Sequence, residues 1–408
     1  MRSPSLRLFL LLMVALAAVG QMSQTLFVPG QGGIAQSFGI SPGLTQGIMA
    51  AYLAMYGLSQ FFYGPLSDSL GRRPIILAGL VLFLAGSLLA WHAASFASLL
   101  AGALIQGLGA GVAGVMVRTV PRDCYQGAAL TRVNSLLSMA LILSPMLAPV
   151  LGGVLVSSFD WRACYLFLLG LGAVVLLLQA LAFKETRPED LEPKAPVWVR
   201  YRSTWRNAHF RHHLWPLLAV FSGVVVFEAV AGVLLGERLG LPAWLVSWLY
   251  IVPLPPYILG SFMAASLAHR WRHKKLLQLG TSLLLTAALS QLLLAWLLPL
   301  SAWTLLAPVS LYFMAAGILG PVATSGALAD FSKGAGTAGA LLGGLQNLAA
   351  GMAAALSSFI PQHDALPLGA LLTLFAVLAW WQARRVGEVS QSLAKTATPV
   401  IETPPQAH

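Results

Sequence analysis

Glu228 is the one acidic residue, of 13 in the chain, that lies well inside an apolar run. A charge near the centre of a bilayer costs at least about 2.5 kcal/mol. Glu228 is therefore driven towards its neutral form, and it can take up or release a proton when its surroundings change. This residue predicts proton coupling and attraction for a cationic substrate. The alternative is a neutral carboxyl that only holds two helices together by a hydrogen bond.

Other polar side chains recur at helical spacing within apolar runs, so they share helix faces. Such groups avoid lipid, and they either bond neighbouring helices or line a central cavity. A tyrosine ring can bind a cation, which favours a cavity for large apolar and cationic compounds. The candidate substrate-binding residues are Gln21, Gln24, Thr25, Tyr52, Tyr56, Gln60, Tyr250 and Tyr257.

A short polar connector, GPLSDSLGRRP, occupies residues 64–74. Gly71 can adopt the positive φ that a tight turn requires. Asp68 can pair with Arg72, with Arg73 or with a neighbouring helix end. A short loop on the positively charged side of a membrane would explain the two arginines, but it would not explain the ordered Gly, Asp and Gly-Arg-Arg together.

Only 9% of the 408 residues are charged and 58% are hydrophobic, whereas an average soluble domain carries roughly 25% charged residues. This composition excludes a soluble globular protein, which needs a charged and mixed surface. A membrane span needs about 20 mostly apolar residues. Runs of that kind predict twelve spans, over residues 8–28, 43–66, 74–92, 97–120, 133–156, 163–183, 214–236, 243–266, 275–297, 301–327, 336–360 and 366–383.

The longest connection divides these spans into two equal sets. The predicted units are a six-helix half over 1–183, a cytoplasmic linker over 184–213, a second six-helix half over 214–390 and a flexible tail over 391–408. With the amino terminus inside, only Arg162 and Arg238 of the 24 basic residues fall outside. Both termini are therefore predicted to be cytoplasmic, and this asymmetry explains the net charge of +11 without a nucleic-acid partner. The alternative for the first run is a cleaved signal peptide, although the run is longer than the apolar core of one.

The connector resembles the loop between the second and third helices of the major facilitator superfamily, Gly-x-Leu-x-Asp-Arg/Lys-x-Gly-Arg/Lys-Arg/Lys. It departs from that motif at Ser69, where the superfamily usually has a base. Residues 144–153, SPMLAPVLGG, are similar to a Gly-Pro-x-x-Gly stretch of the proton-coupled exporters, with Ala148 in place of the usual Gly. The resemblance assigns gating roles to Gly64, Asp68, Gly71, Arg72, Arg73, Pro145, Pro149, Gly152 and Gly153.

This resemblance implies an all-α membrane protein with the major facilitator fold, in which twelve transmembrane helices form two pseudo-symmetric six-helix halves. The drug/proton antiporters of the superfamily resemble the chain over nearly its whole length, for example at residues 119–123 and 161–167. Exporters of that kind have an arginine three residues before a Gln-Gly pair, but this chain has Ala103 before Gln106. Arg118 is the only basic substitute in that run, and it either joins a proton relay or merely extends to the membrane interface.

Taken together, these features predict a proton-coupled multidrug efflux carrier of the bacterial inner membrane, which exports amphipathic and lipophilic compounds by alternating access. The alternative is a secondary carrier of one metabolite, such as a sugar or an amino acid. The sequence contains no zinc-protease, nucleophile-elbow or phosphate-loop motif, so no catalytic residue and no enzyme activity are expected.

Neither a cofactor nor a metal is expected, because His209, His212 and His213 have no Cys or acidic cluster beside them. Cys124 and Cys164 are predicted to be free thiols. The expected partners are lipophilic or cationic drugs, protons and membrane lipid, with no nucleic acid, and the chain is expected to be a monomer.

Overall fold

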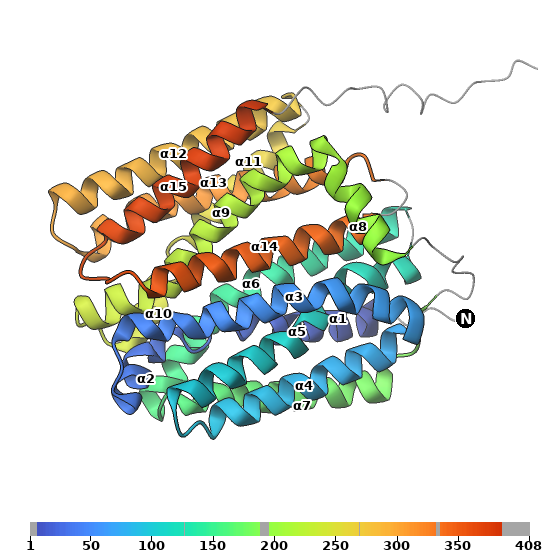
Figure 1. Ribbon diagram of the computed structural model, residues 1–408, viewed down its shortest axis with the longest axis horizontal. Coiled ribbons are helices and arrows are strands. Elements are labelled where there is room, and N and C mark those ends of the chain that lie inside the picture. Colours follow the sequence, from blue (N-terminus) through green and yellow to red (C-terminus); the bar gives the residue numbers. More distant parts are fainter. Residues whose placement is uncertain (1–5, 126, 188–195, 269, 332–334, 386–408) are drawn as a thin grey trace, which may run out of the picture.

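The computed structural model describes residues 6–125, 127–187, 196–268, 270–331 and 335–385. Every regular element in these ranges is a helix. Figure 1 shows the long helices running roughly alongside one another in two groups, one containing α1 and α3–α7 and the other containing α9, α11–α13 and α15. The predicted tail over 391–408 lies outside the described residues.

The first group is formed by α1 (Leu6–Met22), α3 (Gln46–Leu70), α4 (Arg72–Trp91), α5 (Phe96–Cys124), α6 (Gly127–Ser158) and α7 (Arg162–Ala182). Three short elements connect α1 to α3, namely η1 (Val28–Gly30), α2 (Gln31–Phe38) and η2 (Pro42–Thr45). We call the end of the bundle at which α3 meets α4 the loop end, and the opposite end the far end.

The second group follows the short helix α8 (Val197–Arg206). It consists of α9 (Ala208–Gly232) with its π-helical extension η3 (Val233–Arg238), α10 (Ala243–Leu249), α11 (Leu254–Leu267), α12 (His273–Leu297), α13 (Ala302–Leu328), α14 (Ala335–Ser358) and α15 (Leu366–Arg385). α8 contacts both groups, because Tyr201 Oη donates to the carbonyl of Phe61 and Arg200 donates to Thr337 Oγ1.

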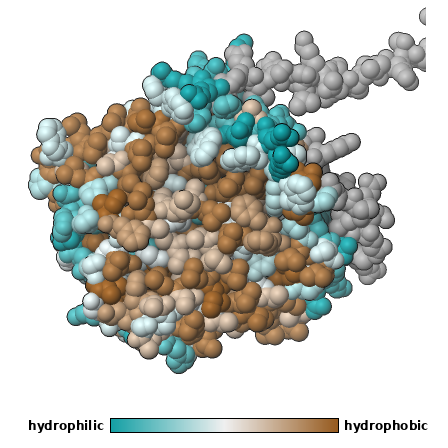
Figure 2. All heavy atoms as spheres, in the orientation of Figure 1, coloured by the Kyte–Doolittle hydropathy of each residue, from teal (hydrophilic) through white to brown (hydrophobic). Residues whose placement is uncertain are grey.

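Nine spans within the described residues are long and apolar enough to cross a membrane. They are α4, α5, α7, α9 with η3, α10 with α11, α12, α13, α14 from Thr337, and α15. α1 and the Leu147–Ser158 part of α6 are shorter apolar helices. Figure 2 shows hydrophobic residues over the middle of the molecule and hydrophilic residues towards its two ends. The all-helical membrane architecture is confirmed, and the count of twelve spans stays a prediction.

The first predicted span, 8–28, is longer than the helix that forms there. α1 ends at Met22, and the chain continues as turns before η1. This irregular backbone lies against α6, where the Thr25 hydroxyl donates to the carbonyl of Pro145 at 2.7 Å. Gly152 allows the carbonyl of Leu26 to come so close that any Cβ at position 152 would overlap it.

The span predicted over 243–266 is a broken helix. α10 ends at Leu249 and α11 begins at Leu254, with turns between them. Pro253, Pro255 and Pro256 lie at this break, and proline has no N–H to continue the ladder of a helix. The break places Tyr250 in a turn, so the direction of its side chain does not follow the helical periodicity of α10 or α11.

Small residues bring the two groups together along α3 and α14. A Cβ at Gly57 would lie 2.7 Å from the backbone nitrogen of Leu348, and one at Gly351 would lie 2.8 Å from that of Ala54. Near the far end, Ser357 Oγ donates to Gln46 Oε1 at 2.6 Å. The helices α3 and α14 therefore touch along most of their length. Elsewhere, Cys124 and Cys164 are free thiols, as predicted.

Candidate functional site

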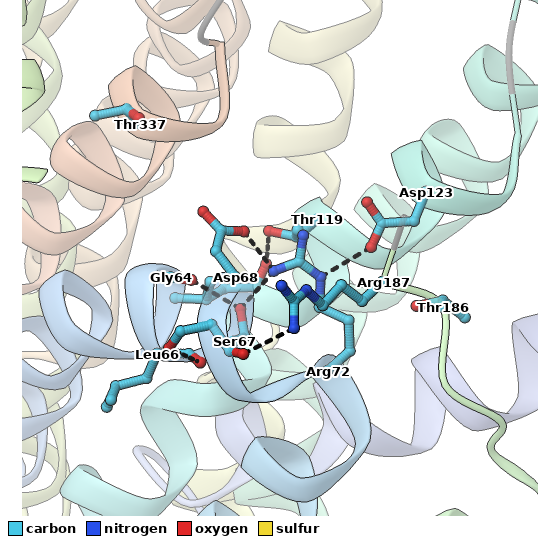
Figure 3. A network of polar contacts seen from close by, with 12 residues as sticks. Gly64, Leu66, Ser67, Asp68, Arg72, Thr119, Asp123, Thr186, Arg187 and Thr337 are labelled. Atoms are coloured by element: carbon cyan, nitrogen blue, oxygen red, sulfur yellow. Dashed lines mark hydrogen bonds and ion pairs between the residues drawn. The ribbon is translucent and has the colours of Figure 1, made fainter. Parts of the chain in front are cut away.

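Arg72 is the centre of a charged network at the loop end (Figure 3). It is 3% exposed, and its Nη1 donates to Asp68 Oδ1 and to Ser67 Oγ, each at 2.7 Å. Its Nε donates to Asp123 Oδ2 of α5 at 2.9 Å. Of the partners considered for Asp68, the structure selects Arg72. One buried guanidinium thus joins the end of α3 to the end of α5 through two carboxylates.

Glu185, just after α7, binds the start of α4. Its carboxylate accepts from the backbone N–H groups of Arg72 and Arg73, at 2.8 and 3.1 Å. It also accepts from Thr186 and Arg187 in its own loop. Burial raises the pKa of Glu185, but these backbone donors outweigh burial and hold that pKa below its usual value. An anion at the amino end of a helix is also favoured by the helix dipole.

Gly71 makes this contact possible. Its φ is +100°, which a residue with a Cβ rarely adopts, as the connector predicted. A Cβ at this position would also lie 2.6 Å from Glu185 Oε2. Glu185 was missed by the sequence reasoning, whose only available signal was an acidic residue directly after an apolar run.

The remaining loop residues fasten α7 to the same network. Arg73 Nη2 donates to the carbonyl of Ala180 at 2.7 Å. At Ser69, where the superfamily motif has a base, Arg187 donates to the backbone carbonyl at 2.8 Å. The guanidinium of Arg187 therefore lies beside position 69, where this chain lacks the basic side chain of the motif. Gly64 accepts a hydrogen bond from Ser67 Oγ through its carbonyl.

The Pro-rich stretch of α6 meets two other segments near the far end. Pro149 has no N–H, so the carbonyl of Pro145 loses its helical donor, and the Thr25 hydroxyl takes that place. Gly153 faces α10, where a Cβ would lie 3.1 Å from the carbonyl of Ala243. This stretch is therefore a contact between the two groups of helices.

Four of the predicted substrate-binding residues form a cluster between α1 and α3. The rings of Tyr52 and Tyr56 stack with centroids 5.7 Å apart, and Gln21 Nε2 donates to Tyr56 Oη at 3.4 Å. Tyr52 Oη donates to the carbonyl of Gly20. Gln60 is buried, and neither polar atom of its side chain has a partner within the described part of the chain.

Arg118 extends from α5 to the same region. Its Nη1 lies against Gly343 of α14, where a Cβ would overlap it, and Gln60 Oε1 lies 2.9 Å from that same Cβ position. No ion pair of Arg118 occurs among the residues that the structure describes. The structure thus brings Arg118 together with the amide of Gln60 at a contact between the two groups.

Glu228 lies on α9, on the other side of the contact between the groups. It is 7% exposed, and its Oε2 has no hydrogen-bond partner in the described ranges. The hydroxyl of Tyr250 donates to its backbone carbonyl. The next carbonyl, that of Ala229, accepts from Gln31 Nε2 at 3.0 Å. Glu228 is therefore next to a hydrogen bond that joins α9 to α2.

The other candidates are dispersed. Thr25 is fully buried in its contact with Pro145, and Gln24 is buried. Tyr257 packs against α13, where a Cβ at Gly317 would overlap its carbonyl. In the part of the chain that is described, no hydrogen bond or ring contact joins Tyr250 or Tyr257 to the Tyr52 and Tyr56 pair.

Residues 10–355 match the sequence profile of the Major Facilitator Superfamily. The chain belongs to the Major Facilitator Superfamily. Multidrug resistance protein D of Escherichia coli (strain K12) is 43% identical over 369 residues, which cover 90% of this chain and 93% of that protein. The Bicyclomycin resistance protein homolog of Haemophilus influenzae is 22% identical, over 92% of this chain and 95% of its own length.

Solved structures of Major Facilitator Superfamily transporters share the fold. The D-xylose-proton symporter superposes with a TM-score of 0.70 at 16% identity, covering 92% of this chain and 98% of its own. The human organic anion transporter MFSD10 gives 0.66 at 20% identity, with 94% and 100% covered. The predicted superfamily and its fold are therefore confirmed, and this superfamily member is a multi-pass membrane transporter.

Proposed function

We propose that the chain is a proton-coupled multidrug exporter of the bacterial inner membrane. The relatives called multidrug resistance and bicyclomycin resistance proteins support drugs as its substrates. The observation that carries the coupling is Glu228, a buried carboxyl without an ionic partner in the described residues, one position from the Gln31 contact between α9 and α2.

At this location Glu228 acts in two ways: it attracts the drug when it is ionised, and it allows the protein to close around it when it is protonated. An ionised carboxylate in an apolar site attracts a lipophilic cation and resists being enclosed. A protonated carboxyl releases the cation and can be buried at low cost. Protons arriving from the outside therefore displace the drug, and the neutral residue then permits the far end to close. Tyr52 and Tyr56 are 1% and 3% exposed in this conformation. When the halves move apart, these stacked rings would form an aromatic and amide surface for the drug together with Gln21 and Gln60.

The loop end faces the cytoplasm in this proposal, because Arg72, Arg73, Arg187 and most other basic residues gather there. Both termini are then cytoplasmic. The halves 1–183 and 214–390 act as units joined by the linker 184–213 and move relative to each other around the drug. The charged network of Arg72 holds the loop end of the first half together during this movement, and the chain works as a monomer without a cofactor.

Transport by proteoliposomes tests the role of Glu228. With an imposed pH gradient, Glu228→Gln should fold and insert but lose accumulation of tetraphenylphosphonium, while exchange down a concentration gradient survives. Glu237→Gln is the matched control, because Glu237 follows on the same helical stretch but is exposed. If Glu228→Gln vesicles respond to the pH gradient as the parent does, Glu228 is only structural and coupling occurs elsewhere.

A further inference from the structure

A cavity of about 480 Å³ lies between α12 and α15 at the loop end, away from the helices that carry the Arg72 network and the tyrosine pair. Its lining combines polar, aromatic and basic side chains, which are Lys274, Gln278, Thr281, Ser282, Trp380 and Arg384. In Figure 1, α12 and α15 lie side by side at the edge of the bundle. The cavity is therefore open to the surroundings of the protein and not to the contact between its halves.

The packing of α12 against α15 explains why the space is at the loop end. Towards the far end the helices are in close contact, since a Cβ at Gly369 would lie 2.8 Å from the Cα of Leu292. One turn further on, Thr373 Oγ1 donates to the carbonyl of Ala288 at 3.3 Å. Nearer the loop end, Trp380 of α15 and Gln278 of α12 line the cavity instead.

The charge of the lining points to an anion. Lys274 stands on one wall and Arg384 on the other, and the Arg384 guanidinium stacks 3.6 Å from the centre of the Trp380 ring. No carboxylate lines the cavity, and neither cation forms an ion pair in the described ranges. Two cations with amide and hydroxyl donors between them suit a phosphate group, which accepts charge-assisted hydrogen bonds.

The surfaces beside the cavity point to a lipid. From Ser282 the same face of α12 continues through the exposed side chains of Leu289 and Leu293, by helical spacing. On α15, Leu374 and Val377 are exposed as well. Figure 2 shows hydrophilic residues gathered near the end of α15, with hydrophobic residues beyond them. A ligand with a phosphate at the loop end and acyl chains along these helices would match both surfaces.

We propose that the α12–α15 cavity binds the phosphate headgroup of an anionic phospholipid from the leaflet at the loop end. Lys274 and Arg384 hold the phosphate, Ser282 and Gln278 donate to the rest of the headgroup, and the acyl chains lie on Leu289 and Leu293. Basic pockets between helices on the cytoplasmic side of membrane proteins bind such headgroups. The proposal uses the membrane location of the chain and is independent of its substrate.

Native mass spectrometry of delipidated protein in detergent, titrated with dioleoyl-phosphatidylglycerol or with dioleoyl-phosphatidylcholine, measures the site directly. The parent should retain phosphatidylglycerol preferentially. Lys274→Gln with Arg384→Gln should weaken that retention by roughly twenty-five-fold, about fivefold for each cation near an anionic lipid surface. The matched control is Lys275→Gln with Arg385→Gln, which removes two cations from the same helices outside the cavity.

Three results would overturn the proposal. An equal loss in both double variants would mean that the lipid is drawn by the basic loop end as a whole. Equal retention of phosphatidylcholine would mean that only the acyl chains are bound. Inorganic phosphate is the third test. If it competes with phosphatidylglycerol and raises the melting temperature of the parent as much as phosphatidylglycerol does, the cavity is a site for a free anion. Melting temperatures of both double variants without lipid show that each is folded.

Discussion

Asp68→Asn tests whether the Arg72 network controls switching between states. The side chains of Arg72 and Asp68 are 4% and 34% exposed, so this pair lies between the surface and the interior. A hydrogen bond to a charged partner contributes about 1.5–3 kcal/mol and a neutral one about 0.5–1.5 kcal/mol. The amide side chain at position 68 can still accept from the charged Arg72 but loses the attraction between opposite charges, so the substitution weakens the contact by about 1 kcal/mol. A difference of that size shifts an equilibrium about fivefold.

We therefore expect Asp68→Asn to slow export from proteoliposomes by about fivefold, while the affinity for tetraphenylphosphonium stays within about twofold. Asp123, whose side chain is 10% exposed, still neutralises Arg72 in this variant. Removing both carboxylates leaves a buried guanidinium without compensation, which costs about 3–5 kcal/mol. The double substitution Asp68→Asn with Asp123→Asn should then lose more than the sum of the single effects.

Ser69→Ala is the local control, because within the described residues the Ser69 hydroxyl bonds only to the carbonyl of Leu66 in the same turn. It should transport as the parent does. An equal fall of affinity and export in Asp68→Asn would refute the reasoning, since the loop would then act on the drug site. A double variant no worse than Asp123→Asn would show that Asp68 contributes nothing to neutralising Arg72.

Three further results are expected. Tyr52→Ala and Tyr56→Ala should change the pattern of resistance among compounds in growth assays, because in the proposed site each drug would contact the stacked rings differently. A uniform loss of resistance that follows expression would mean that the two rings only pack. The pKa of Glu185 is lowered in the folded state, so its stabilising effect is present above the ordinary carboxyl pKa and is lost as the pH falls through the folded value. The melting temperature of Glu185→Gln should accordingly lie below that of the parent at neutral pH and converge with it in acid, and a constant gap would contradict the capping role. Gly57→Ala should destabilise the protein or separate α3 from α14, since its Cβ would lie 2.7 Å from the Leu348 nitrogen. Gly170→Ala, with nothing within 4 Å, should keep or raise the melting temperature, because Ala favours a helix more than Gly does.

The loop motif shows how much the sequence can predict. Asp68 lies in the last turn of α3, and Arg72 follows four residues later, just after α3 ends. Their pairing therefore follows from local spacing. Glu185 lies 113 residues from Arg72 in the chain, and no periodicity or composition connects two such positions. Only the packing of α7 against α4 brings them together.

The breaks within predicted spans were missed for a different reason. Hydropathy is insensitive to backbone geometry, so a run such as 243–266 looks continuous although three prolines interrupt α10 and α11. Pro253, Pro255 and Pro256 are the sequence signal for this break. The end of α1 at Met22 has no such signal, because it depends on the contact of Thr25 with α6.

The hydrogen bond from Thr25 to the carbonyl of Pro145 changes which contact resists bending of α6. A helix that bends normally stretches hydrogen bonds of its own backbone, and it resists the bend for that reason. At Pro145 the bond that must stretch belongs to Thr25, on a segment 120 residues away in the chain. Bending of α6 at this point therefore pulls on residues 23–30 and, through the bond of Gln31 to Ala229, on α9 beside Glu228. These two hydrogen bonds connect the proline-rich part of α6 to the segment of α9 that carries Glu228, the carboxyl proposed to couple transport to protons.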